Sequence, residues 1–201
     1  MTEAANISID ESVLVQQCRC GDSAAMERLI LRYQNRIYNV ILRMCGNADD
    51  AAELTQEVFV KVIENVGGFE GRSRFYTWLF RIAVNLTLNH CSRNVRLATR
   101  SLEAEYGSGD GGAREALGRV LSDQHCPDPA EVAANRELCS LVICGLDRLD
   151  DKHRAVVVLR DIEGMSYAEV SEVLGLELGT VKSRLSRARS NLREILESIL
   201  R

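Results

Sequence analysis

The sequence is poor in aromatic residues, prolines and histidines, and it has no long apolar run. Aromatic residues make up 5% of its 201 residues, which disfavours an all-β fold because strands are rich in aromatic side chains. No run approaches about 18 uncharged apolar residues, so membrane insertion is not expected. Three scattered histidines form no catalytic constellation, so we do not expect an enzyme. The net charge of −4 carries no overall basic signal for nucleic acid.

Cysteine is also too scarce for a disulfide scaffold, with seven residues spread along the chain. Cys18 and Cys20, and the pairs 90–91 and 125–126, lack the spacing of a zinc site, so we favour buried thiols and expect no metal or cofactor. Redox sensing by an exposed Cys18, Cys20 or Cys126 is a hypothesis that a Cys→Ser series would test. Residues 1–15 are acidic and lack the apolar segment of a signal peptide, so we expect a cytoplasmic protein.

Apolar residues recur at helical spacing on both sides of one stretch of different composition. Helices are predicted from about 25 to 45, 49 to 66 and 73 to 93, and again over 138–149, 150–164, 166–175 and 180–199. Residues 97–134 hold both prolines, a glycine-rich run at 107–112 and, after Arg100, seven acids against two arginines, which is typical of a flexible acidic linker. We therefore predict an all-α protein with two small helical domains, 10–96 and 135–201, joined by the linker 97–134.

Charges of one sign gather in separate segments. Residues 71–100 contain six arginines and no acid, and residues 180–201 contain six basic residues and two acids. Residues 47–70 are the reverse, with six acids and one lysine. A phosphate backbone responds to charge within a screening length of about 8–10 Å, so two local basic surfaces suffice for nucleic-acid binding despite the negative total. The alternative is that each basic run is a solvated helix face.

The C-terminal segment has the pattern of a helix-turn-helix. Ser166 and Glu169 form a capping box, Gly175 ends a short helix, and Thr180 is placed to cap the next one. The apolar side of this last helix carries Val181 and Leu185. On the polar side we expect base readout by one set, Lys182, Ser183, Ser186 and Arg187, and phosphate contact by another, Thr180, Arg184 and Arg189. An ordinary antiparallel helix pair with a basic surface is the alternative.

A second polar face lies on the helix predicted over 73–93. It carries Arg74, Trp78, Arg81, Asn85 and Asn89, opposite Phe75, Leu79, Ile82 and Leu86. Amides read base edges, arginines hold phosphates and aromatic rings stack on unpaired bases. We favour a core position for Trp78 over stacking on a base, and for Asn85 we favour a base contact over a hydrogen bond within the domain.

These segments resemble a known family. Residues 50–59 (DAAELTQEVF) and 69–85 (FEGRSRFYTWLFRIAVN) resemble region 2 of bacterial extracytoplasmic-function (ECF, RpoE-like) sigma factors of the sigma-70 family. Residues 161–170 (DIEGMSYAEV) and 179–189 (GTVKSRLSRAR) resemble region 4 of the same family. Both motifs occur in the family's order, and the resemblance covers about 10–96 and 135–200.

The resemblance implies a transcription initiation factor that directs core RNA polymerase to stress- or envelope-type promoters. It places contact with the β′ clamp helices on Asp50, Glu53, Gln56 and Glu57, and contact of region 4 with the β flap. It places −10 recognition and promoter melting on the loop 69–74, with Arg72 and Arg74, and on the helix of Asn85, and −35 recognition on region 4. It also implies an anti-sigma factor as a partner. The alternatives are a stand-alone helix-turn-helix regulator, which would not depend on polymerase, and a protein-only interaction module.

Overall fold

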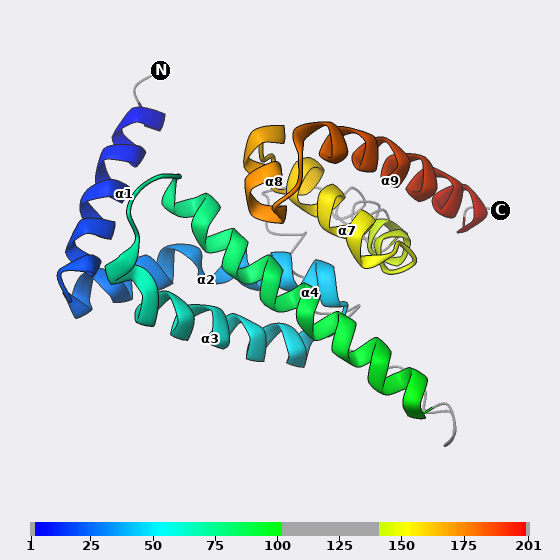
Figure 1. Ribbon diagram of the computed structural model, residues 1–201, viewed down its shortest axis with the longest axis horizontal. Helices are drawn as coiled ribbons and strands as arrows, with labels where there is room; N and C mark the ends of the chain where they lie inside the picture. Colours follow the sequence, from blue (N-terminus) through cyan, green and yellow to red (C-terminus); the bar gives the residue numbers. More distant parts are fainter. Residues whose placement is uncertain (1–2, 102–140, 200–201) are drawn as a thin grey trace, which may run out of the picture.

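A computed structural model describes residues 3–101 and 141–199, with side chains over 11–94 and 141–199 (Figure 1). Every regular element in these ranges is helical, and no strand occurs in them. The predicted all-α fold of two helical domains is therefore confirmed. The predicted linker lies outside the described residues from 102 onward.

The N-terminal domain contains four α-helices in antiparallel and crossing contact. They are α1 (Glu3–Arg19), α2 (Ser23–Cys45), α3 (Ala48–Asn65) and α4 (Phe75–Ser101), with a 3₁₀ turn, η1 (Val66–Gly68), after α3. Helix α1 was not predicted, and α4 runs eight residues beyond the expected end near residue 93. Asp22 caps α2 and Asn47 caps α3, each by accepting two backbone N–H bonds.

Local sequence explains where α2 ends. Gly46 has φ of +72°, the left-handed conformation that glycine adopts without steric cost, and its N–H donates to the Leu42 carbonyl. The stripes predicted to be apolar on α2 and α3 are buried throughout, from Ala25 to Met44 and from Ala51 to Val66. These helix faces therefore pack as the periodicity predicted.

The C-terminal domain consists of short helices followed by one long helix. Residues 141–147 are helical, and α7 (Asp151–Val157), a π-helical turn η2 (Val158–Ile162), α8 (Tyr167–Leu174) and α9 (Leu178–Ile199) follow. Asp150 caps α7, and Gly175 ends α8 with φ of +62°. The prediction that Thr180 caps the last helix is wrong. The Glu177 carbonyl already accepts a hydrogen bond from the N–H of Val181, so the helix begins at Leu178.

The two domains pack against each other. Helix α8 lies against the N-terminal half of α4, and α7 and η2 lie against α2 (Figure 1). The buried apolar side chains form one contiguous core that extends from α1 to α9. We call this packing of α2 and α4 on α7, η2 and α8 the closed arrangement.

Candidate nucleic-acid interface

A capping box begins α8, and a glycine ends it before the turn into α9. The Ser166 hydroxyl accepts a hydrogen bond from the Glu169 N–H at 3.2 Å, and the Glu169 carboxylate accepts one from the Ser166 N–H at 2.8 Å. This pair satisfies two donors at the start of α8, and Gly175 then lets the chain turn directly into α9. The geometry is that of a helix-turn-helix, in which the second helix presents its outer face.

Helix α9 has one buried side and one open side. Val181, Leu185 and Ala188 are buried in the domain core. All four residues predicted to read bases are exposed on the other side: Lys182, Ser183, Ser186 and Arg187. Arg184 is half-buried and Thr180 is exposed within the first turn. Nothing in the domain covers this face in the part of the chain that the structure describes.

Arg189 differs from the rest of the predicted set because it forms a salt bridge with a carboxylate of the same domain. Its Nε and Nη2 donate to the two carboxylate oxygens of Asp161 at 3.0 and 2.5 Å. This bidentate pair raises the pKa of Arg189, chiefly through the hydrogen bond. A phosphate contact by Arg189 therefore requires exchange of Asp161 for the phosphate, and its DNA role stays a prediction.

A tyrosine that sequence reasoning missed lies beside this face. The guanidinium of Arg160 lies 4.8 Å from the ring centroid of Tyr167, and the Lys182 ammonium lies 5.9 Å from it. Cation–π contacts of this kind orient long basic side chains. The position of Tyr167 directly after the cap residue was the only sequence signal, and it gave no indication of the two cations.

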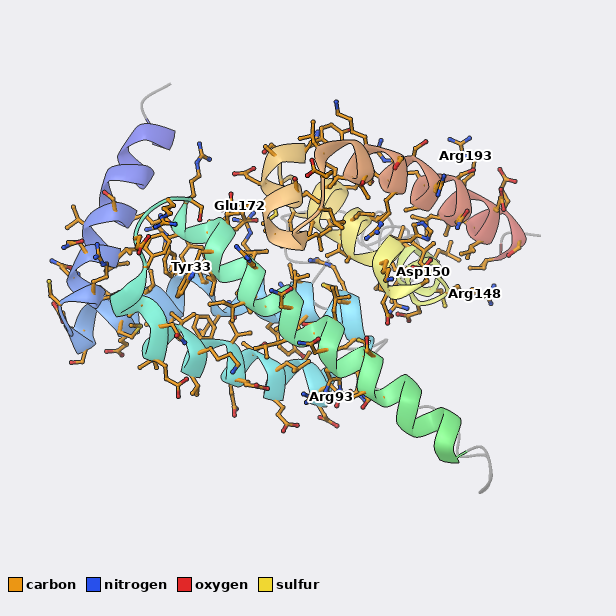
Figure 2. The ribbon with its side chains drawn as sticks, in the orientation of Figure 1. Tyr33, Arg93, Arg148, Asp150, Glu172 and Arg193 are labelled. Carbon is orange, nitrogen blue, oxygen red and sulfur yellow. The ribbon has the colours of Figure 1, made fainter. Side chains whose placement is uncertain are left out.

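On the N-terminal domain, the amides predicted to contact bases line a groove between α3 and α4. Asn85 and Asn89 are exposed, and with His90 and Arg93 they form the α4 side of this groove. Leu54, Glu57 and Lys61 form the α3 side. Lys61 was not predicted, because it is the single basic residue of an acidic segment. Arg93 projects from α4 on the side remote from α9, whereas Arg193 projects outward from α9 (Figure 2).

The three arginines predicted to contact the −10 element differ in their partners. Arg81 is exposed on α4. Arg72 pairs with Glu70 at 2.6 Å in the loop before α4, where Gly71 has φ of +72°. Arg74 is 83% exposed and pairs with Glu169 of the other domain at 3.6 Å. The structure thus does not bring the three arginines into one free cationic patch.

Trp78 is half-buried at the edge of the core. Its ring packs 5.3 Å from the ring centroid of Phe69 and 5.5 Å from that of Phe75. These contacts attach the loop that carries Arg72 and Arg74 to the start of α4.

The residues predicted to contact polymerase lie on α3. Glu53, Gln56 and Glu57 are exposed, and Glu57 pairs with Lys61 at 3.8 Å. Asp50 is half-buried at the start of the helix and pairs with His90 of α4 at 3.1 Å. Asp50 therefore also acts in packing α3 against α4.

The described cysteines lie partly where the sequence predicted them. Cys20 is exposed, as expected, but Cys18 is buried, which contradicts the prediction that it is exposed. The unpredicted helix α1 explains this, since Cys18 lies on its apolar side with Leu14 and Val15. Cys126 lies outside the described residues. Within the described ranges no group of three histidine, cysteine or acidic side chains is placed to hold a metal ion, and none of the helices is long and apolar enough to cross a membrane.

The chain matches two family models and several known proteins along most of its length. A family model described as Sigma-70 region 2 matches residues 29–97, and one described as Sigma-70, region 4 matches residues 140–192. The RNA polymerase sigma-H factor of Pseudomonas aeruginosa is 34% identical over 192 residues, which is 94% of each chain. The ECF sigma factor SigW of Bacillus subtilis is 32% identical over 185 residues, 92% of this chain and 96% of SigW.

Solved structures show the same fold. CnrH in complex with the cytosolic domain of CnrY matches with a TM-score of 0.62 and 24% identity, over 94% of this chain and 97% of that one. The sigma factor RpoE in complex with the anti-sigma factor NepR from Bartonella quintana matches with a TM-score of 0.65 and 22% identity, over 85% of this chain and 96% of that one. The chain belongs to the extracytoplasmic-function group of the sigma-70 family of RNA polymerase sigma factors. Sigma factors are non-enzymatic transcription initiation factors, and the region 2 match does not favour a stand-alone regulator.

Proposed function

We propose that this sigma factor reads the −35 element with the exposed face of α9 and the −10 element with α4 and the loop before it, when it is bound to core RNA polymerase. The observation that carries the proposal is the presence of exposed reading faces on two different domains. One face holds Lys182, Ser183, Ser186 and Arg187, and the other holds Arg81, Asn85 and Asn89.

The −35 element is read in the major groove. Burial of Val181 and Leu185 turns the opposite side of α9 outward, so the start of the helix enters the groove. Arg187 and Lys182 can donate to guanine O6 and N7, and the small hydroxyls of Ser183 and Ser186 let the helix approach the base edges closely. Phosphate contacts by Thr180, Arg184 and Arg189 set its orientation.

The −10 element is held as a separated strand. Asn85 and Asn89 lie four residues apart, so they share one face of α4, and both border the groove to α3. An extruded base fits a partly enclosed, amide-lined site, and extrusion costs a few kcal/mol that contacts in the site offset. Arg72, Arg74 and Arg81 supply the positive charge that the strand requires.

Core polymerase binds the acidic face of α3, with Glu53, Gln56 and Glu57 on the β′ clamp helices and region 4 on the β flap. The location is cytoplasmic, where the polymerase acts, and the chain itself needs no cofactor and catalyses no reaction. An anti-sigma factor is the expected inhibitor, as the structures of CnrH and RpoE were both determined with a bound partner protein.

Run-off transcription with purified core polymerase tests the proposal. The chain with core enzyme should initiate at discrete sites of a genomic library, whereas neither component alone should do so. Protection of duplex DNA by the isolated chain, with no effect of polymerase, would instead support a stand-alone regulator. Unchanged transcription with an Arg187→Ala chain would favour a protein-only interaction module.

A further inference from the structure

A buried carboxylate of one domain is paired with two arginines of the other. Glu163 follows η2, and its side chain is 6% exposed. Its carboxylate accepts from Arg36 Nε at 2.7 Å and lies 3.4 Å from Arg43 Nη1, while Arg36 Nη2 also donates to the Glu163 carbonyl at 3.3 Å. Both arginines lie on α2. We call Glu163, Arg36 and Arg43 the interdomain ion cluster.

Two aromatic rings of α4 lie beside Arg36 of this cluster. The Arg36 guanidinium lies 4.6 Å from the ring centroid of Tyr76 and 5.8 Å from that of Phe80. The side chains of Glu163 and Arg43 are 6% and 9% exposed, so their attraction is shielded from water and stronger than that of a surface pair, whereas the side chain of Arg36 is 48% exposed.

A second polar contact joins the domains at the end of α2. Arg154 of α7 donates to the carbonyls of Leu146, Asp147 and Leu149 at 2.8, 2.8 and 3.0 Å, and it donates across to the Met44 carbonyl at 2.6 Å. A guanidinium at a helix C-terminus is favourable because the unpaired carbonyls there carry partial negative charge. The domains approach so closely here that a Cβ at Gly46 would lie 3.2 Å from Asp147 Oδ1.

One feature of the closed arrangement favours separation of the two domains. The Tyr76 hydroxyl is buried, and among the described residues it makes no hydrogen bond of good geometry, although the Arg36 guanidinium lies beside its ring. Burial is the largest cause of the raised pKa of Tyr76, and the nearby charges of Glu163 and Glu169 add to it while Arg36 opposes it. A buried hydroxyl without a hydrogen bond is unfavourable, and hydration on opening would supply that bond.

The closed arrangement holds the two proposed reading faces close together. Arg74 of the −10 surface pairs with Glu169, which lies two residues after Tyr167 on α8, and Tyr167 contacts Lys182 of the −35 surface. These contacts place Arg74 and Lys182 within roughly 25 Å of each other. Promoter elements centred about 25 base pairs apart are separated by roughly 85 Å of B-form DNA. The closed arrangement cannot bridge both elements at once.

From this mismatch, which rests in part on the proposed function, we propose that the interdomain ion cluster is a lock that keeps the free chain closed and that core polymerase opens. An ion pair suits a reversible lock. On opening, water hydrates both partners, so the cost of separation is far smaller than the cost of leaving one charge buried alone. In the absence of polymerase, only the small fraction of molecules that is open at any moment can bind both elements.

Single-molecule FRET on the full chain tests the lock. Donor and acceptor dyes are placed at Glu64 and Glu197, both exposed, through non-natural amino acids so that the native cysteines stay unlabelled. The free wild-type chain should show high transfer, which should fall when core polymerase is added. Glu163→Gln and Arg36→Ala should each lower transfer without polymerase. The matched control is Glu172→Gln, an exposed acid of α8 that should change nothing (Figure 2).

DNA binding supplies the second readout. Because closure blocks only simultaneous contact, free Glu163→Gln should bind a DNA fragment that carries both elements at promoter spacing, with the −10 strand unpaired, at least about threefold more tightly than the wild type, and Glu172→Gln should not. Equal transfer in wild type and both lock variants would overturn the proposal, as would high transfer in the polymerase complex. Helical content measured by circular dichroism distinguishes opening from unfolding. Because the FRET of the free chain requires no promoter activity, failure of the proposed function would leave its result intact.

Discussion

Helices α4 and α9 are both basic, but they differ in how much of their surface is buried. Helix α9 buries only the stripe of Val181, Leu185 and Ala188, and its opposite side is open. Helix α4 buries Phe75 and Leu79 as predicted, but it also buries Phe80, Val84 and Thr87, which were not expected to be inside. The difference shows that an amphipathic pattern predicts the exposed face of a helix with one packing partner but not of one that lies at the centre of two domains.

The largest expected effect tests the second buried face of α4. Phe80→Ala should destabilise the chain by about 3–5 kcal/mol, because it removes a fully buried ring that contacts α2 and the interdomain ion cluster. Urea unfolding followed by circular dichroism measures this. Arg81→Ala, next in sequence but exposed, should change stability by less than about 0.5 kcal/mol. A loss below about 1 kcal/mol for Phe80→Ala would mean that this face is not packed in solution.

The next effect tests the open face of α9. Arg187→Ala or Lys182→Ala should cost about 1–3 kcal/mol of binding at the −35 element and relax its base preference, because each removes a donor to a base edge. Competition binding of the polymerase complex to a library of −35 sequences measures both quantities. Arg193→Ala removes the same charge farther along α9 and serves as the control (Figure 2). Similar losses for both arginines would indicate purely electrostatic binding.

A smaller, step-specific effect is expected on α4. Asn85→Ala should lower open-complex formation by about 1–2 kcal/mol and leave duplex binding nearly unchanged, because an extruded base is available only after melting. Permanganate reactivity reports the melted strand, and filter binding reports the duplex. Asn35→Ala, an exposed amide of α2, is the control. If Asn85→Ala lowered both quantities equally, its assignment to the separated strand would be wrong.

The smallest effect concerns the capping box at the start of α8. Burial acts to raise the pKa of Glu169, but hydrogen bonds from Ser166 and the charge of Arg74 outweigh it, so the pKa is lowered. A depressed folded-state pKa stabilises the fold above the ordinary glutamate pKa of about 4.3, and this stabilisation is lost as pH falls below it. Thermal melts between pH 6 and 3 should therefore show less acid destabilisation for Glu169→Gln, whose amide keeps the cap, than for wild type. Parallel curves would exclude this contribution.

The candidate sites were predictable to different degrees. The set on α9 that we propose to read bases is exposed as a group, and this was predictable because helical periodicity and a capping box are local signals. On the other domain, Asn85 and Asn89 share a groove, but Arg72 and Arg74 pair with Glu70 and Glu169. Those pairings were not predictable, since a lone arginine gives no indication of which carboxylate lies nearby. Helix α1 was missed because the buried positions among its described side chains, Leu14, Val15 and Cys18, cover less than two turns.

The amino-acid sequence by itself determined the helices, most of their ends and the outward side of α9. Capping residues, glycines and the 3.6-residue repeat act over a few positions, so their effect can be predicted from short stretches of the sequence. Only the tertiary structure decided that Glu163 meets Arg36, 127 residues away, and that Tyr76 and Phe80 lie beneath them. Attraction between charges and burial of apolar area depend on distance in space, and the chain sets that distance only once both domains have folded and packed.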